Sequence, residues 1–352
     1  MKFSILVPAY NEEQSISSCL NSLTSLNYCD KEIIVIDDAS TDRTTQIVER
    51  FLDKGVILVR REKNGGRAAA LNSGLQKATG DVVVTTDADT VVPSDWLQRY
   101  TSCFEHQDTV AVGGAYQASN KDNVLAHATS VLDQILNGVF KKSLVPNKLS
   151  GVNSAIRREE LSGLGGFNEN SWWSEDSELG WKLNKIGEVI YDSDNIVKTQ
   201  YPDTWAGIWK RKFYWGYAMG LKFREQIPFN IKLWIRPILF MVLFISLLTF
   251  LVTIPCGMHV FLLPGLIFLI FLSSITIVYV PLGVIVMVRN RDQRFIKTLS
   301  VLAILPAVRE FAYVCGMCLG FCKGRVGSIR PSWKEKINHR DAESTEKNIN
   351  LM

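Results

Sequence analysis

The chain has 352 residues, of which 47% are hydrophobic and 10% aromatic, and its formal net charge is only +4. Residues 1–200 hold 20 Lys and Arg against 27 Asp and Glu, a net charge of −7, whereas residues 201–352 hold 19 against 8, a net charge of +11. This division excludes a uniform soluble globule, and the abundance of residues that can be buried excludes a disordered chain. The acidic first half lacks a basic patch with interleaved aromatic residues, so we expect no nucleic-acid partner.

The first half alternates apolar runs with helical patterns. The runs that predict strands are residues 3–7, 32–37, 56–59 and 81–86, and the helical patterns between and after them are residues 11–26, 42–52, 66–78 and 94–104. This order predicts an α/β domain with a mostly parallel, Rossmann-like sheet covered by helices on both faces. In such sheets, ligands bind beyond the carboxyl ends of the strands.

Two carboxylates, Asp87 and Asp89, stand two residues apart directly after a predicted strand. Acidic residues are common in turns, so it is the position after an apolar run that favours a functional role. Hard divalent cations take oxygen ligands and often bridge to substrate phosphates. The pattern therefore predicts Mg²⁺ or Mn²⁺ at these residues, acting as a Lewis acid on a diphosphate leaving group.

Asp38 and Arg67 lie in two further segments that start predicted helices. The helix that follows Asp37 and Asp38 needs one N-cap residue, which any of residues 40–42 can supply. Capping therefore does not explain the two acids that precede these residues. Asp38 could instead accept a hydrogen bond from a nucleobase N–H. Arg67 follows two glycines that permit close approach of a ligand, where it could meet a phosphate or ribose; the alternative is a surface arginine on a loop.

Glu175 and Asp176 follow Trp172 and Trp173 and open a predicted helix that runs to residue 186. Acids are favoured at helix N-termini for electrostatic reasons alone. Tryptophans beside paired acids also suit a general base next to a surface on which a sugar stacks. The neighbouring carboxylate would raise the pKa of such a base towards a useful value.

The second half is apolar and basic. Residues 235–254 carry one charge and residues 260–288 carry none, and each segment is long enough to cross a bilayer core of ~30 Å. The segment 299–321 contains Arg309 and Glu310. Basic clusters follow both the second and the third segment, and both clusters should lie on the cytoplasmic side. Three simple spans would put them on opposite sides, so we expect two spans with the third segment re-entrant or interfacial. A third span is the alternative.

Residues 205–217 mix aromatic and basic side chains, which predicts a helix in the headgroup region of an anionic leaflet. The N-terminus lacks the features of a secretory signal. We therefore expect a multi-pass protein of the cell membrane with its catalytic domain in the cytoplasm. Its predicted parts are a catalytic domain, interfacial helices, a transmembrane region and a basic cytoplasmic tail, at residues 1–200, 201–233, 234–322 and 323–352.

Seven motifs in order across roughly residues 3–190 resemble the family 2 glycosyltransferases with the GT-A fold. The first motif contains Pro8, Ala9, Tyr10 and Glu12 and looks like the family's opening strand and loop. Four of the other motifs contain the acids and Arg67 discussed above. The remaining two, residues 150–158 and 165–169, look like the family's segments on the side of the acceptor. The seven motifs are residues 7–13, 37–42, 64–72, 87–89, 150–158, 165–169 and 175–176.

The resemblance implies inverting transfer of a sugar from a nucleoside diphosphate sugar, with UDP or GDP as the nucleotide. It implies that Asp38 binds the base and that Asp89 binds Mg²⁺ or Mn²⁺. Asp87 would bind the ribose or the metal. It further implies that Asp176, beside Glu175, deprotonates an acceptor hydroxyl. Donor contacts are also expected from the remaining matched residues Pro8, Ala9, Tyr10, Glu12 and Arg67.

The resemblance and the apolar second half together lead us to expect a single addition of sugar to a hydroxyl of a lipid-linked saccharide at the membrane surface. Three alternatives remain. A processive polysaccharide synthase would carry a Gln-x-x-Arg-Trp motif, which this sequence lacks. A polyprenyl-phosphate sugar synthase of the dolichol-phosphate mannose type acts on an ionised phosphate that needs no base, so Glu175 and Asp176 disfavour it. A non-catalytic membrane scaffold is disfavoured by the intact set of acids.

Overall fold

The computed structural model describes residues 1–139, 149–170, 175–225 and 295–323. Two compact units divide the chain: residues 1–120 with 139–201, and residues 121–138 with 202–352. The segment 121–138, which the sequence analysis placed in the catalytic domain, thus groups with the C-terminal part. The two expected spans, Trp172, Trp173 and residues 324–352 lie outside the described residues.

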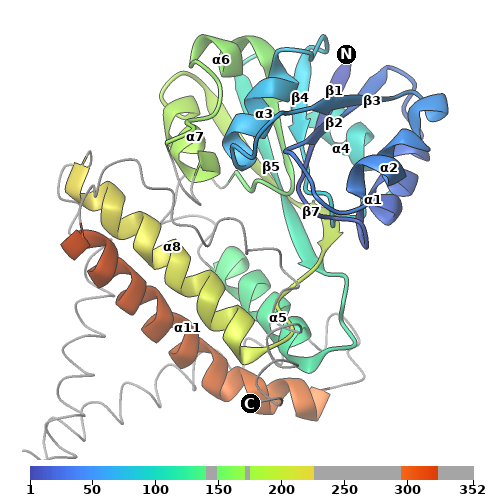
Figure 1. The fold of residues 1–352 in the computed structure, drawn as a ribbon. Coiled ribbons are helices and arrows are strands. Elements are labelled where there is room, and N and C mark those ends of the chain that lie inside the picture. The colour runs from blue at the N-terminus through green and yellow to red at the C-terminus, as the bar shows by residue number, and fades with distance from the viewer. Residues whose placement is uncertain (140–148, 171–174, 226–294, 324–352) are drawn as a thin grey trace, which may run out of the picture. The chain divides into compact units, whose positions relative to one another are not determined.

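A seven-stranded sheet lies at the centre of the first unit (Figure 1). Its spatial order is β3-β2-β1-β4-β6-β5-β7. Only β6 runs antiparallel to its neighbours, so the predicted mostly parallel α/β sheet is confirmed. The strands in chain order are β1 (Phe3–Ala9), β2 (Lys31–Asp37), β3 (Val56–Arg60), β4 (Val82–Thr85), β5 (Thr109–Ala118), β6 (Ser154–Arg157) and β7 (Glu188–Thr199).

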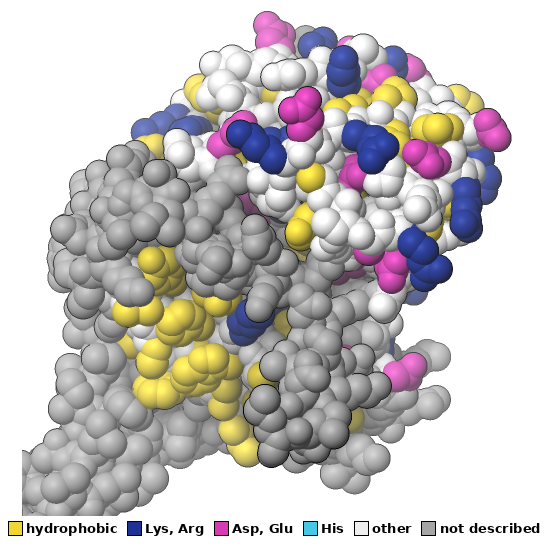
Figure 2. All heavy atoms as spheres, viewed as in Figure 1, with side chains coloured by type: hydrophobic (Ala, Val, Ile, Leu, Met, Phe, Trp, Pro, Cys, Tyr) yellow, Lys and Arg dark blue, Asp and Glu magenta, His cyan; other side chains and the backbone are white. Residues whose placement is uncertain are grey.

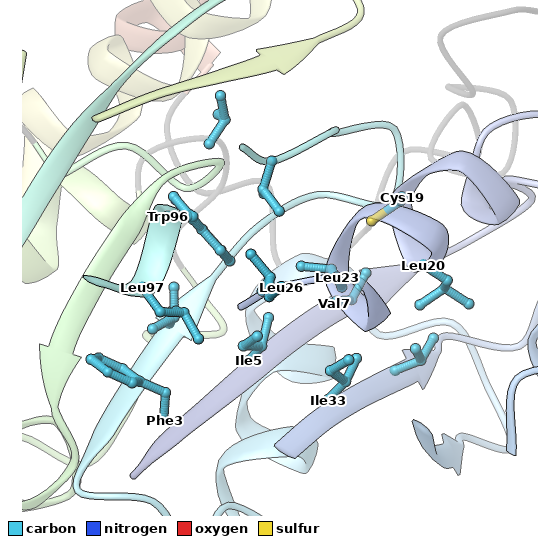
Figure 3. Close-up of a cluster of buried hydrophobic side chains, with 14 of the residues drawn as sticks. Phe3, Ile5, Val7, Cys19, Leu20, Leu23, Leu26, Ile33, Trp96 and Leu97 are labelled. Atoms are coloured by element: carbon cyan, nitrogen blue, oxygen red, sulfur yellow. The ribbon is translucent and has the colours of Figure 1, made fainter. Parts of the chain in front are cut away.

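Both faces of this sheet are covered because its central strands are apolar on both sides. Phe3, Ile5 and Val7 of β1 point to one face, where they pack in a buried cluster with side chains of the helices there (Figure 3). Leu6 points to the opposite face and packs in a second cluster. The helices of this unit are α1 (Ile16–Thr24), α2 (Thr44–Glu49), η1 (Leu52–Lys54), α3 (Arg67–Leu75), α4 (Trp96–Cys103), α6 (Arg158–Gly163) and α7 (Glu175–Leu183).

The described part of the second unit is helical: α5 (Val124–Val139), α8 (Trp205–Glu225) and α11 (Phe295–Lys323). The backbones of α8 and α11 approach closely at two glycines. A Cβ atom on Gly216 would lie 1.9 Å from the Tyr313 carbonyl oxygen, and one on Gly316 would lie 1.8 Å from the Phe213 carbonyl oxygen. A buried ion pair between Arg309 and Asp133 joins α11 to α5 beside a small apolar cluster.

The surfaces of the two units differ in character. Figure 2 shows charged side chains of both signs scattered over the visible face of the first unit, whereas hydrophobic side chains gather on that of the second. On α11, Ile304 and Leu319 are exposed. Nevertheless, no helix in the described parts of the chain is long and apolar enough to cross a membrane. That finding includes α11, which holds the alternative third span over residues 299–321.

Candidate active site

The loops that follow β1 and β2 are joined to each other by hydrogen bonds. Asn11, in the left-handed region at φ 55°, accepts the Thr41 N–H on its Oδ1 at 2.7 Å and donates its own N–H to Ser40 Oγ at 3.0 Å. Ala39 is also left-handed, at φ 63°, a conformation that is uncommon for a residue with a Cβ atom. Such strained residues concentrate at functional sites, and sequence reasoning did not single out either one.

The residues of the opening motif, which are expected to contact the nucleotide-sugar donor, occupy two kinds of position. Pro8 and Ala9 lie within β1, where Ala9 is buried and pairs in register with Asp37. Tyr10 and Glu12 lie beyond the strand and are partly exposed. The Glu12 carboxylate accepts a hydrogen bond from Ser15, which fixes it at the entry to α1.

Asp38 is buried beneath the turn that precedes α3. Its carboxylate accepts the N–H of Gly65 at 2.9 Å, the N–H of Gly66 at 2.7 Å and a hydrogen bond from the Arg61 guanidinium. Burial raises the pKa of Asp38, and these donors oppose that shift. The Gly65 N–H also lies 3.1 Å from the second carboxylate oxygen, so each oxygen of Asp38 accepts two hydrogen-bond contacts. Arg61 had no signal in the sequence, because its partner is 23 residues away.

Arg67 connects the metal motif to the acidic pair. Its Nε donates to Asp87 Oδ1 at 3.0 Å and its Nη1 donates to Glu175 Oε1 at 2.9 Å, while Nη2 donates to the Gly151 carbonyl oxygen. Burial alone would lower the pKa of Arg67, but Asp87, Glu175 and Asp176 raise it. The structure thus brings together four predicted site residues around one guanidinium.

Asp176 has the environment of a general base. Burial, and then the negative charge of Glu175, raise its pKa to about 6, although Arg67 and the N–H groups of Gly151 and Ser177 favour the ionised form. The Gly151 N–H donates to Asp176 Oδ2 at 3.0 Å. A base works best when its pKa lies near the working pH, so this carboxylate suits proton abstraction from a hydroxyl group.

Asp89 is held at the end of the sheet by Thr199 of β7, whose Oγ1 donates to Asp89 Oδ1 at 3.0 Å. Beneath it lies the buried thiol of Cys19, which donates to the Asp87 carbonyl oxygen at 3.5 Å. Burial raises the pKa of Cys19, and the charges of Asp89, Asp87 and Glu12 raise it further.

The donor chemistry of this region fits a hard divalent cation. Among the described residues, no group of three or more His, Cys, Asp or Glu forms a metal cage. Mg²⁺ is usually held by one or two carboxylates, with substrate phosphates and water completing its ligands. Asp87 and Asp89 supply these carboxylates, so they would hold Mg²⁺ or Mn²⁺, and a bound diphosphate would add further ligands.

A small pocket opens between Arg67 and Asp176. Gly151 lies on the segment that leads into β6 and Ser154 is the first residue of that strand, and four of the lining side chains are apolar. The lining residues are Arg67, Thr85, Leu149, Gly151, Ser154, Ile156, Phe167, Asp176 and Leu179.

Asn153 fixes the backbone next to this pocket. Its Oδ1 accepts hydrogen bonds from the Trp96 indole N–H at 2.8 Å and from the Tyr100 hydroxyl. Its Nδ2 donates to the carbonyl oxygens of Ala115 at 2.7 Å and Asn195 at 2.8 Å. Asn153 is fully buried, so a single amide ties the chain beside Gly151 to α4, β5 and β7.

Comparison with known proteins identifies relatives of part of this chain. A family model described as "Glycosyl transferase family 2" matches residues 4–163. The poly-β-1,6-N-acetyl-D-glucosamine synthases of Staphylococcus aureus (strain COL) and Staphylococcus epidermidis are 30% and 31% identical over 219 residues. Each alignment covers 60% of this chain and 53% of the relative, so the chain spans about half the length of these relatives.

A solved structure shares the fold. The mannosyltransferase PcManGT from Pyrobaculum calidifontis, in complex with GDP-Man and Mn²⁺, aligns with a TM-score of 0.57 at 20% identity. The alignment covers 91% of this chain and 87% of that one. This likeness confirms the expected GT-A fold.

Proposed function

We propose that the protein, whose residues 4–163 match the glycosyl transferase family 2 model, moves a sugar from a nucleoside diphosphate sugar to a hydroxyl group, with inversion. The observation that best supports this proposal is the pairing of a base with a raised pKa, Asp176, and a diaspartate motif through one arginine. A base for the acceptor and a cation site for the departing diphosphate are the two needs of this reaction.

The roles proposed for the residues follow from their surroundings. Asp176 takes the proton of the acceptor hydroxyl, and Glu175 beside it keeps its pKa high. Asp38 lies next to the nucleobase, with Tyr10 and Glu12 beside the sugar donor. Asp87 and Asp89 would hold Mg²⁺ or Mn²⁺, which stabilises the negative charge on the departing diphosphate.

We propose that the acceptor is a lipid-linked saccharide and that the site faces the cytoplasm at a membrane. The apolar segments 235–254 and 260–288 support this location, as does the basic, aromatic character of α8. In that helix, Lys212 Nζ and the Arg211 guanidinium lie 4.1 and 5.7 Å from the centre of the Trp215 ring. Such amphipathic side chains are favoured where headgroups meet hydrocarbon.

A processive synthase is the second candidate, because the similar Staphylococcus proteins are named as synthases of a polymer. The sequence lacks the Gln-x-x-Arg-Trp motif that separates the two activities. The products distinguish the candidates: single addition gives one new species, whereas processive synthesis gives a ladder of lengths.

The test uses the full chain in detergent micelles with Mn²⁺ and a panel of UDP- and GDP-sugars. A true donor should raise the melting temperature, because it binds only the native state. Asp176→Asn should keep that rise but lose transfer to a membrane-lipid extract, whereas Asp194→Asn, at an exposed aspartate, should keep both. Transfer by Asp176→Asn at the wild-type rate would favour a phosphate acceptor and refute the proposed base.

A further inference from the structure

Arg67 makes contacts that donor binding alone does not require. Its side chain is 26% exposed, and its guanidinium contacts the carboxylates of Asp87 and Glu175 and the Gly151 carbonyl oxygen. Gly151 in turn donates its N–H to Asp176. One cation therefore touches the diaspartate motif, the acidic pair and the backbone that holds the base.

The contact with Asp87 sets up a competition between two cations. Arg67 Nε lies 3.0 Å from Asp87 Oδ1, and Asp87 is also a carboxylate that a divalent cation would use. An oxygen that pairs closely with a guanidinium is a weaker ligand for a second cation, because the two positive charges repel each other.

We propose that Arg67 is an internal counter-cation and a positioning residue of this site. With no metal bound, it neutralises Asp87, and a divalent cation must displace it from Asp87 in order to bind. Arg67 would then keep Glu175 and Gly151 as partners, so that metal binding is coupled to the position of Asp176. This inference rests on the proposed function only in taking Asp87 as a metal ligand.

The backbone beside Arg67 is matched to this position. A Cβ atom on Gly151 would lie 2.9 Å from three atoms of the Arg67 guanidinium, closer than side chains tolerate. Gly151→Ala would therefore push the guanidinium aside and leave its charge in the protein. This variant tests the placement of the cation separately from its presence.

The experiment measures Mn²⁺ binding to the full chain in detergent by isothermal titration calorimetry, without nucleotide. Arg67→Ala should bind Mn²⁺ at least ~fivefold more tightly than wild type, the weakest effect expected for a unit charge ~4 Å away in water. Arg67→Lys keeps the positive charge but lacks the planar guanidinium group. Its Mn²⁺ affinity should therefore lie between those of wild type and Arg67→Ala. Arg99→Ala is the matched control and should leave the affinity unchanged, because Arg99 pairs with Asp95 at the start of α4 and has no contact with the acids of the site.

Each result bears on the proposal. Equal or weaker Mn²⁺ binding by Arg67→Ala overturns it, as does an absence of binding by both proteins at millimolar Mn²⁺. Tighter binding that persists in Arg67→Ala/Asp87→Asn also overturns it, because Asp87 would then not be the shared ligand. Binding by Arg67→Ala alone supports it.

The test does not depend on one variant or on catalysis. If Arg67→Ala fails to fold, as judged by its melting curve, Arg67→Lys and Gly151→Ala decide the question, and both should bind Mn²⁺ more tightly than wild type. Loss of sugar transfer with every donor would refute the proposed function but leave the Mn²⁺ titrations interpretable. Unchanged titrations with normal transfer would refute only the role of Arg67.

Discussion

Truncation of Asn153 should destabilise the first unit more than its small size suggests. Asn153→Ala removes two acceptor contacts, to Trp96 and Tyr100, and two donor contacts, to Ala115 and Asn195. All four partner groups would remain inside the protein. The change therefore leaves buried polar groups without partners, which is more damaging than the loss of an exposed hydrogen bond.

The magnitude follows from the number of groups left unpaired. Each buried donor or acceptor without a partner costs ~1 kcal/mol or more, so four groups give a loss of ~4 kcal/mol unless water enters the cavity. For a domain of this size, 1 kcal/mol corresponds to ~2–4 °C in melting temperature. We expect the first unit of the Asn153→Ala variant to melt ~8–16 °C below wild type.

The assay is thermal unfolding of the full chain followed by intrinsic fluorescence. Asn168→Ala is the control with the same chemical change, because Asn168 is partly exposed and its partner Glu178 can bind water instead. That variant should melt within about 2 °C of wild type. A melting temperature for Asn153→Ala equal to that of the control would refute the reasoning, since the network would then contribute no net stability.

Four further predictions concern the acids. Sugar transfer should rise with pH through about 6 as Asp176 loses its proton, and Glu175→Gln should move the rise to lower pH, as measured by the pH profile of kcat. Since the pKa of folded Asp176 lies above its unfolded value of ~3.9, its ionised form weakens the fold as pH rises from about 4 to about 6. Asp176→Asn should therefore raise the melting temperature at pH 7 but not at pH 4. Mn²⁺ together with a nucleotide-sugar donor should raise the melting temperature of wild type. Asp89→Asn should abolish this rise because it removes a carboxylate ligand, and a chelator should abolish it because it removes the cation. Asp133→Ala removes the carboxylate that pairs with the buried Arg309 and should destabilise the second unit by about 3–5 kcal/mol, as measured by denaturant unfolding.

Each of these outcomes has a clear opposite. A flat pH profile between pH 5 and about 7 would mean that Asp176 does not limit the rate. A full Mn²⁺ effect in Asp89→Asn would place the cation elsewhere. Unfolding of Asp133→Ala at the wild-type denaturant midpoint would mean that water or another side chain compensates Arg309.

The first four strands could be predicted because each is a short apolar run rich in Val and Ile. The strands β5 and β7 lack that pattern: β5 contains Gly113 and Gly114, and β7 carries charged residues such as Asp192. Their pairing joins residues about 80 positions apart, so the partner rather than the local sequence makes the strand. The helix expected from residue 11 begins only at Ile16, because Asn11 is left-handed and joins the two loops.

The acids of the candidate site could be predicted because they directly follow strands or open a helix. Arg61 could not, since its partner lies 23 residues away. Gly151 and Asn153 lie in the matched segment 150–158, but their hydrogen bonds to Asp176 and Trp96 depend on the fold. Arg67 was predicted as a donor ligand, but its link to Glu175 spans 108 residues and appears only once the chain is folded. The sequence thus points to the chemical groups, whereas their connections depend on the fold.

The buried Cys19 gives this site a native reporter. A thiol with a raised pKa that lies out of reach of solvent reacts slowly with alkylating agents. Its sulfur contacts the backbone of Asp87, so it becomes reactive only when the diaspartate loop and α1 separate. The alkylation rate of Cys19, set against that of the exposed Cys29, would therefore measure how often this end of the sheet opens, and whether Mn²⁺ and a donor hold it closed.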